Sequence, residues 1–421
     1  MSSRTSYFGS IRAVLAWILV VYGLYFAPLF LHLYRLDHLY DEDRIVHNFL
    51  NMQDLFPTRA VRAPAETSEF RRAEIELPET FSFEGADRNL EEYLEYSRST
   101  GMLVLKDDTI VYEQYWLGHR EDGQHISWSV AKSFISALIA IALEEGKIIS
   151  INEPITHYLP ELVGSGYDEV RIKDILQMSS GVGFNEDYAD PDSDINRFGR
   201  TIAFGGSMAK FAASLERARE PGSYHHYVSI DTQVLGMLLT RVTGVSIASY
   251  LEEKIWRQLG MEHDAYWMLD GTGMEVALGG LNASLRDYAR FGMLYLNRGK
   301  FRGRQIVPAR WVRASTSPGG PHLMPGKGNP ASSSSWGYGY QWWIPGPGNS
   351  DYTAAGVYNQ YIYVNPGARV VIVKNSANRR YLVERQESKD LHIAMFRAIA
   401  EALRKSPAAR SSSEARDRAA R

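Results

Sequence analysis

The alternation of apolar and polar positions predicts β-strands toward both ends of the globular part of the chain. The segment GMLVLKDDTIVYEQYW, residues 101–116, has two β-rich runs around a polar Lys-Asp-Asp turn, which predicts a hairpin. Near the other end, YGYQWWI at 338–344 and YIYVNPGARVVIVKNS at 361–376 have the composition of strands. We therefore expect one sheet that both ends of the chain build together.

Between these runs the spacing of apolar residues predicts helices. FISALIAIALEEGKI, residues 134–148, is apolar enough for a buried helix, and Gly146 stands where a glycine commonly ends one. ASLRDYARFGMLYLNRGK at 283–300 has the pattern of an amphipathic helix that ends in a glycine, and DLHIAMFRAIAEALRK at 390–405 that of a terminal helix. Helices with loops are also expected over most of 150–275.

These elements predict an α+β fold, in which an antiparallel sheet is flanked by helices and carries a mainly helical insertion. The sheet part would come from residues 80–145 and 276–405, and the helical part from 146–275. Residues 35–79 are polar with scattered apolar positions, so we expect a connector there. The low-complexity tail at 406–421 is expected to be disordered.

The N-terminus carries a long apolar run. Residues 13–31 contain no charge, and a helix of that length spans about 28 Å, close to the ~30 Å hydrocarbon core of a bilayer. We expect one transmembrane helix over 13–34, with 1–12 in the cytoplasm and the remainder of the chain exported. A cleaved signal peptide is an alternative, although the sequence at 25–28 matches an A-x-A-like cleavage site poorly. A buried helix of a soluble protein is the third alternative.

Composition narrows the range of chemistry. The 421 residues include no cysteine, which excludes disulfides, thiolate catalysis and cysteine-ligated zinc. The formal charge of -3 gives no reason to expect a nucleic-acid partner. The sequence has neither a His-Glu-x-x-His motif nor a phosphate-binding glycine loop, so we expect no metal and no cofactor.

The segment HISWSVAKSF, residues 125–134, places Ser129 and Lys132 one helical turn apart if the chain is helical from Ser129 onward. A serine hydroxyl is a weak nucleophile and needs a base within hydrogen-bond reach. A lysine can be that base when burial lowers its pKa, and the helix after Lys132 is very apolar. A backbone N–H at the start of the helix would be free to stabilise an oxyanion. A solvated serine and lysine at a helix start is the alternative, because both residues are common.

Three further segments support the catalytic interpretation: Tyr227-Val228-Ser229, RIKDILQMSSGVGFNEDY at 171–188 and LGGLNASLRDYARFGMLYLNRG at 278–299. Together with the Ser-x-x-Lys motif, they resemble the serine β-lactamase and penicillin-binding protein superfamily over roughly residues 80 to 400. The resemblance is closer to its class C-like branch of esterases, D-aminopeptidases and 6-aminohexanoate-dimer hydrolases. It implies a β-lactamase/transpeptidase-like fold and hydrolysis through an acyl-enzyme.

The resemblance also implies roles for individual residues. Ser129 would be acylated, Lys132 would act as its base, and Tyr227 would relay the proton to the leaving group. Ser229 stands where many members have asparagine, and its hydroxyl could bond the lysine or the substrate. The alternatives are a core tyrosine at 227 and a merely structural serine at 229.

The third motif of the family, K-T-G or H-x-G, has its best counterpart in Ala354-Ala355-Gly356. The cationic residue, which in β-lactamases helps to hold the carboxylate of the antibiotic, is missing, so we expect slow β-lactam hydrolysis. Gly356 would leave room for the substrate against the strand. The backbone N–H of Val357 would be the second oxyanion donor.

Asp187 and Tyr188 are weaker candidates for contact with substrate, the alternative being a loop-capping role. His225 and His226 adjoin Tyr227, but the sequence has no Gly-x-Ser-x-Gly motif to present a serine, so we expect them to flank the pocket or lie at the surface and not to form a Ser-His-Asp triad.

The sequence therefore predicts a membrane-anchored serine hydrolase that cleaves amide or ester bonds of a small molecule or short peptide-like substrate outside the cytoplasm. A β-lactamase or D,D-peptidase is one alternative. The other is a non-catalytic protein that binds ligands on the same scaffold. Oligomeric state is not predicted.

Overall fold

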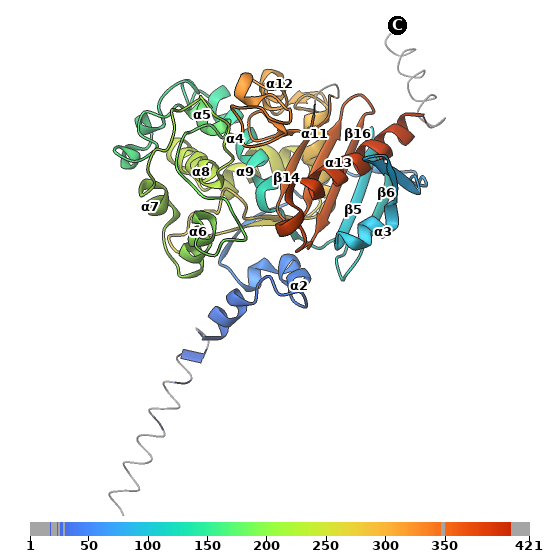
Figure 1. The fold of residues 1–421 in the computed structure, drawn as a ribbon, viewed down its shortest axis with the longest axis horizontal. Helices are drawn as coiled ribbons and strands as arrows, with labels where there is room; N and C mark the ends of the chain where they lie inside the picture. The colour runs from blue at the N-terminus through green and yellow to red at the C-terminus, as the bar shows by residue number, and fades with distance from the viewer. Residues whose placement is uncertain (1–16, 18–22, 24–25, 28–29, 347–349, 406–421) are drawn as a thin grey trace, which may run out of the picture.

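The fold is described from a computed structural model of the chain, which describes residues 17, 23, 26–27, 30–346 and 350–405. Two parts lie side by side, one built around a large sheet and one mainly of helices (Figure 1). The mixture of sheet and helices agrees with the predicted β-lactamase/transpeptidase-like class.

The large sheet has eight strands in the order β12-β13-β14-β15-β16-β5-β6-β2. All neighbouring strands are antiparallel except the short edge strand β2, which runs parallel to β6. The predicted hairpin at 101–116 is confirmed as β5 and β6, and the runs at 338–344 and 361–376 are also strands. The bounds are β2 Arg71–Arg72, β5 Ser99–Lys106, β6 Thr109–Tyr115, β12 Gly337–Tyr338, β13 Trp343–Ile344, β14 Tyr352–Gly356, β15 Gln360–Asn365 and β16 Val370–Ser376.

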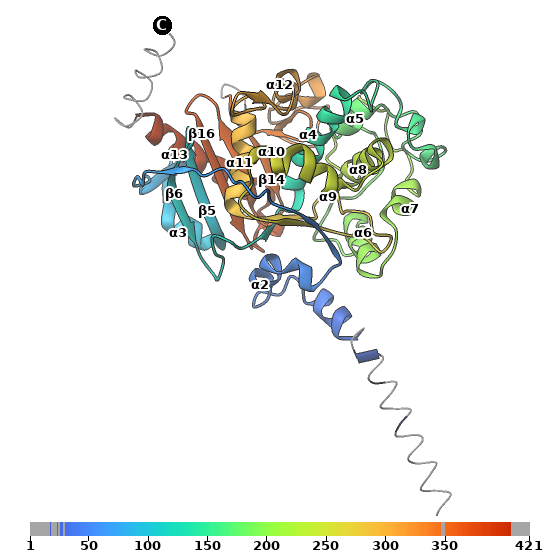
Figure 2. The same ribbon diagram turned by 180° about the vertical axis from the view of Figure 1, so that it is seen from behind.

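Helices cover both faces of this sheet (Figures 1 and 2). Helix α11 (Leu285–Leu296) packs on β5, β15 and β16, and it confirms the predicted amphipathic helix. Helix α13 (Tyr381–Lys405) lies on the other face against β15 and β16. Its helical geometry is interrupted at Arg385, which has φ 42° and ψ −105°. The small hairpin of β3 (Thr80–Phe83) and β4 (Ala86–Asn89) and helix α3 (Leu90–Tyr96) complete the same face.

The second part is centred on two buried helices in contact with each other, α4 and α8. Helix α4 (Ala131–Glu144) confirms the predicted buried helix, and it ends just before Gly146, which has φ +70°. Helix α8 (Ser229–Thr243) packs beside it. The surrounding helices are α5 Ile172–Leu176, α6 Asp194–Ala203, α7 Met208–Ala213, α9 Ile247–Leu251, α10 Arg257–Leu259 and, at the edge next to the sheet part, α12 Ala309–Ser315.

A second sheet, in the order β1-β8-β9-β7, lies beside the nucleophile segment. Strand β8 belongs to a range that was expected to be mainly helical, and strand β1 belongs to the expected connector. Strands β1 and β8 are far apart in the sequence, and their antiparallel pairing provides hydrogen-bond partners for the backbone N–H and C=O groups of both. The bounds are β1 Thr58–Val61, β7 His125–Ile126, β8 Ala265–Met268 and β9 Leu281–Ala283.

The segment at 35–79 is therefore part of the folded body. Besides β1 and β2 it contains helix α2 (Ile45–Leu50), whose Phe49 is fully buried in the core. Packing against distant segments fixes the position of these residues, and a local polar pattern does not report such packing.

Most of the expected transmembrane helix at 13–34 and the whole tail at 406–421 lie outside the described residues. Residues 30–37 are helical and lead away from the body (Figure 1). Among the described residues no single helix has the length and apolar character to cross a membrane. One pair of helices, Ser229–Thr243 with Ile247–Leu259, meets those criteria only jointly, and it is bent by 76°.

Candidate active site

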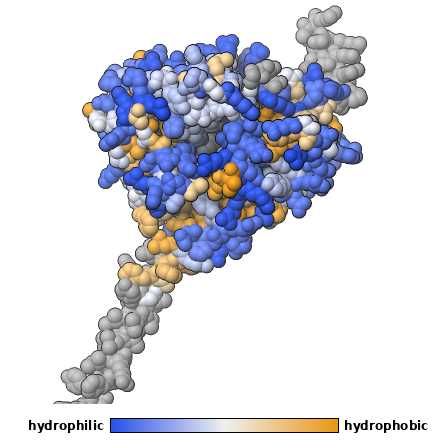
Figure 3. All heavy atoms as spheres, in the orientation of Figure 1, coloured by the Kyte–Doolittle hydropathy of each residue, from blue (hydrophilic) through white to orange (hydrophobic). Residues whose placement is uncertain are grey.

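An open pocket of about 340 Å³ lies between the helical part and the sheet. Figure 3 shows this face of the molecule hollowed between the two parts. The wall of the pocket is formed by the 3-10 turn η2 (Trp128–Val130), β14, α13, the loop before α8 and two further loops. The lining residues are Ser129, Glu186, Asp187, Tyr188, Ala189, Tyr227, Ser333, Ser334, Ser335, Trp343, Ala355, Gly356, Val357, Tyr381, Leu382, Arg385, Gln386 and Lys389.

Ser129 and Lys132 meet at the start of the buried helix. Ser129 lies in the short 3-10 turn η2 (Trp128–Val130), which leads directly into α4. Lys132 Nζ donates to Ser129 Oγ at 2.8 Å and to the carbonyl oxygen of Leu278 at 2.6 Å. Lys132 is 1% exposed, and this burial lowers its pKa to about 7, while the charge of Glu186 acts in the opposite direction. A substantial fraction of the lysine is therefore neutral near pH 7 and able to accept the serine proton.

Tyr227 completes the arrangement around the serine. Its hydroxyl is hydrogen-bonded to Ser129, and its ring centroid lies 5.3 Å from Lys132 Nζ. Burial raises the pKa of Tyr227 well above its usual value, so the phenol stays protonated and can donate a proton. The structure thus brings the three residues selected from the sequence into one hydrogen-bonded group.

Ser229 has a partner that the sequence did not indicate. Its hydroxyl donates to Glu186 at 2.5 Å and its backbone N–H donates to the same carboxylate at 2.8 Å. Tyr188, a predicted pocket residue, also donates to Glu186 at 2.8 Å. Glu186 precedes the candidates Asp187 and Tyr188 directly, and its inward position depends on the loop conformation, which the sequence pattern does not report.

Glu186 is the carboxylate whose charge raises the pKa of Lys132, so its removal should change the pH dependence of the reaction. We expect Glu186→Gln, whose amide oxygen can still accept from the hydroxyls of Tyr188 and Ser229, to move the acidic limb of the kcat/KM profile to lower pH by roughly 0.5–1 unit. Measurement of ester hydrolysis between pH 5 and 9 checks this shift. The control is Glu220→Gln, an exposed carboxylate outside the pocket lining. An unshifted limb in Glu186→Gln would contradict the electrostatic coupling.

The end of β14 lies directly against the backbone of the nucleophile. A Cβ atom on Gly356 would come within 2.6 Å of the Ser127 carbonyl oxygen and 3.1 Å of the Ser129 nitrogen, so only glycine fits without displacement. Val357 follows in the turn after this strand and lines the pocket with Ser129. The two backbone N–H groups expected to bind an oxyanion therefore belong to adjacent segments.

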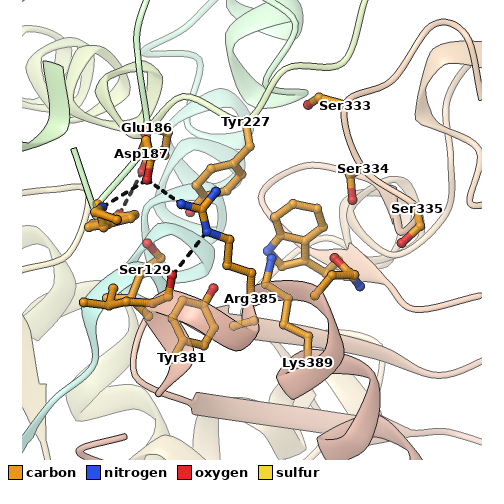
Figure 4. A pocket seen from close by; sticks show the side chains of 18 residues that line it. Ser129, Glu186, Asp187, Tyr227, Ser333, Ser334, Ser335, Tyr381, Arg385 and Lys389 are labelled. Carbon is orange, nitrogen blue, oxygen red and sulfur yellow. Dashed lines mark hydrogen bonds and ion pairs between the residues drawn. The ribbon is translucent and has the colours of Figure 1, made fainter. Parts of the chain in front are cut away.

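The Asp187 carboxylate caps its own loop and also forms an ion pair with a residue of α13 at the pocket. It accepts from the Ala189 N–H at 3.0 Å and pairs with Arg385 of α13 at 2.7 Å. Figure 4 shows the Asp187 and Arg385 side chains pointing toward each other in the pocket. The cation missing at Ala354 of β14 has no replacement on that strand, but Arg385 and Lys389 bring two positive charges to the pocket from α13. Sequence reasoning did not select either residue.

The two histidines next to Tyr227 do not line the pocket. His225 is buried and its Nδ1 lies 3.0 Å from Ser332 Oγ, while His226 Nε2 lies 3.2 Å from the carbonyl oxygen of Phe184. Burial lowers the pKa of His225 to about 3. Within the described part of the chain, no group of three or more potential ligands is arranged to hold a metal ion.

A family model described as Beta-lactamase matches residues 86–396. The 6-aminohexanoate-dimer hydrolase of Paenarthrobacter ureafaciens is 30% identical over 342 residues, which cover 78% of this chain and 84% of that protein. A structure titled "Putative 6-aminohexanoate-dimer hydrolase from Bacillus anthracis" has a TM-score of 0.79 at 27% identity and covers 88% of this chain and 97% of that one.

A more distant structure shows how widely the fold is shared. The octameric penicillin-binding protein homologue from Pyrococcus abyssi has a TM-score of 0.55 at 22% identity, covering 76% of each chain.

Proposed function

Because this chain belongs to the beta-lactamase family of serine hydrolases, we propose that it cleaves amide or ester bonds of small substrates through an acyl-enzyme on Ser129. The observation that carries this proposal is the joint contact of Lys132 and Tyr227 with the serine hydroxyl. A nucleophile, a base that is partly neutral near pH 7 and a protonated phenol then face one open pocket.

The reaction follows from these positions. Ser129 Oγ attacks the carbonyl carbon while its proton passes to neutral Lys132, and the N–H groups of Ser129 and Val357 stabilise the oxyanion. Tyr227 gives its proton to the leaving amine or alkoxide as the carbon–nitrogen or carbon–oxygen bond breaks, and it regains a proton from the ammonium of Lys132. Water then attacks the acyl-enzyme by the same route and releases the acid.

The substrate that we propose is a linear amide or ester. The similarity to the 6-aminohexanoate-dimer hydrolase, whose name specifies a linear amide, supports this choice. The small neutral residue Ala354 in the third motif argues against efficient recognition of an antibiotic carboxylate on β14. A β-lactamase or D,D-peptidase is therefore the second candidate.

A chromogenic ester tests the proposal. We expect p-nitrophenyl butanoate to give a burst of p-nitrophenol and a mass increase of one butanoyl group on Ser129. Nitrocefin turnover should be slow or absent. Failure to form any adduct would favour a non-catalytic ligand-binding protein on the same scaffold. Nitrocefin hydrolysis near the rate of a dedicated β-lactamase would favour the second candidate.

We also propose that the N-terminal segment anchors the enzyme in a membrane, with the catalytic part outside the cytoplasm. The uncharged run at 13–31 supports this location, as do the exposed side chains of Trp17 and Phe30, which are 71% and 73% accessible. Fractionation of cells that produce the full chain should place it in the membrane fraction. A fragment that begins at Leu36 should be soluble, and recovery of the full chain in the soluble fraction would contradict the anchor.

A further inference from the structure

The turn between β14 and β15, residues 357–359, carries the expected second oxyanion donor and has an unfavourable backbone conformation. Val357 provides the N–H group, and the next two residues, Tyr358 and Asn359, have φ 60° and φ 69°. Positive φ is unfavourable for residues other than glycine, most of all for a bulky one such as tyrosine. Such conformations persist only where the surrounding contacts enforce them. The position of the donor therefore depends on the groups that hold this turn.

The side chain of Gln360, the first residue of β15, bonds back to the turn. Its Nε2 donates to the carbonyl oxygen of Val357 at 3.2 Å and to that of Tyr358 at 3.1 Å. These carbonyls belong to the two peptide groups that follow the Val357 N–H along the chain. A carbonyl in a turn has no strand partner and needs another one when it is buried. Here a single side-chain amide serves both of them.

The other contacts of Gln360 fix its amide to β16. Nε2 also donates to the carbonyl oxygen of Ser376 at 2.7 Å, and Oε1 accepts from the Ser376 N–H at 3.1 Å and from Asn375 Nδ2 at 3.2 Å. The pairing of β16 with β5 is irregular at these same two residues. Gln360 is fully buried, and a half-rotation of its amide would set the oxygen against carbonyl oxygens. The amide therefore has one orientation.

Gln360 lies directly behind the nucleophile segment. Gly356 is its partner across the hairpin, and a Cβ atom added to Gly356 would lie 3.2 Å from Gln360 Cβ and 3.1 Å from the Ser129 nitrogen. Strand β15 also contacts η2. Gln360 does not belong to the residues that line the described pocket. Its effect on a bound substrate must therefore pass through the turn.

Tyr358 is also held by aromatic contacts, but these act on its side chain. The rings of Tyr40 and Phe49 lie 5.5 Å and 5.2 Å from the Tyr358 ring, measured between centroids. Ring contacts of this kind have little directional preference for the peptide groups of the turn. The hydrogen bonds of Gln360 act on those peptide groups directly.

We propose that Gln360 is a positioning residue for the oxyanion, because its amide ties the peptide groups after Val357 to β16 and so fixes where the Val357 N–H points. This inference rests on the proposed function, since it concerns the second donor of that reaction. A displaced donor weakens binding of the negatively charged, tetrahedral transition state more than binding of the neutral substrate. Formation and hydrolysis of the acyl-enzyme both pass through such a state, so kcat should fall with little change in KM.

Gln360→Met tests this role, because methionine keeps the approximate volume and removes all five hydrogen bonds of the amide. We expect kcat for p-nitrophenyl butanoate to fall by about tenfold or more, with KM within about twofold of wild type. Butylboronic acid gives a second readout. Ser129 Oγ adds to its boron, the serine proton passes to Lys132, and the resulting tetrahedral boronate has an oxygen at the oxyanion position. Its inhibition constant should rise by about the factor by which kcat falls.

Gln341→Met is the matched control. Gln341 is also a buried glutamine, but its amide accepts from Thr232 and donates to the carbonyl oxygen of Leu176, away from the turn. This variant should have a lower melting temperature, with kcat and boronate affinity within about twofold of wild type. A folded Gln360→Met enzyme with wild-type kcat and boronate affinity would overturn the inference, as would an equal loss in Gln341→Met.

If Gln360→Met does not fold, Asn375→Ala replaces it, because it removes one hydrogen bond to the amide and leaves the backbone of β16 in place. We then expect kcat and boronate affinity each to fall about threefold at unchanged KM. No fall in either quantity would overturn the inference. A wild-type enzyme that forms no adduct and hydrolyses no ester would refute the proposed function, and the inference would fail with it.

Discussion

Replacement of Ser129 by alanine is expected to abolish turnover, with a fall in kcat of about 10⁴-fold or more. Among the described pocket residues, Ser129 has the only hydroxyl that both Lys132 and Tyr227 contact, and Lys132 Nζ lies 2.8 Å from it. No neighbouring hydroxyl can therefore take over as the nucleophile. Activity that remains would come from the oxyanion donors and substrate binding alone. Progress curves with p-nitrophenyl butanoate and intact-mass analysis measure the two consequences, loss of turnover and loss of the butanoyl adduct.

Ser133→Ala provides the matched control for that experiment. Ser133 is buried in the same helix, but its hydroxyl donates to the carbonyl oxygen of Gln341 and not to a pocket residue. This variant should lose some stability and keep its kcat. Wild-type turnover by a folded Ser129→Ala enzyme would rule out the acyl-enzyme.

Lys132 should give the reaction a steep dependence on pH. Its pKa of about 7 means that the neutral, proton-accepting form increases as the pH rises through 7. We expect kcat/KM for the ester to rise about tenfold per pH unit below 7 and to level off above it. A profile that is flat between pH 5 and 9 would contradict the lysine as base.

Lys132→Arg should lose activity by about 10²–10⁴-fold at every pH between 5 and 9, because a guanidinium group does not deprotonate in proteins.

The burial of Lys132 also affects the stability of the fold. Between about pH 7 and the ordinary value of 10.5, the unfolded chain carries a proton on this lysine that the folded chain lacks. The contribution of Lys132 to the free energy of unfolding therefore increases as the pH rises through this window. Lys132→Met should remove that contribution, as measured by denaturant unfolding at pH 7 and pH 9.

The elements with strong local patterns could be predicted from the sequence. Helices α4 and α11 bury continuous apolar faces, and the hairpin of β5 and β6 has polar residues at its turn, so neighbouring residues alone determine these elements. The catalytic group could also be selected, because Ser129 and Lys132 lie one turn apart and the resemblance supplied Tyr227. Local information was sufficient in these cases.

The remaining features depend on contacts between distant segments. Strand β1 has only four residues and is held by β8, and Phe49 is buried by Trp128 and Tyr358. Glu186 faces inward because its loop folds over the end of α8. Lys389 reaches the pocket because α13 crosses the sheet beside β14. A one-dimensional pattern shows the composition of these segments but not what they pack against.

The order of strands in the large sheet has a consequence for folding during synthesis. Strand β5, near the start of the domain, pairs along its whole length with β16, and β1 pairs with β8. Loop-closure entropy makes such long-range pairing slow. Because synthesis proceeds from the N-terminus, β5 also leaves the ribosome long before its partner β16 has been made. The nucleophile segment follows β5 directly, while Gly356 and Val357 emerge near the end of translation. A nascent or prematurely terminated chain therefore holds the serine without the second half of its site, and hydrolysis begins only when the C-terminal strands close the sheet.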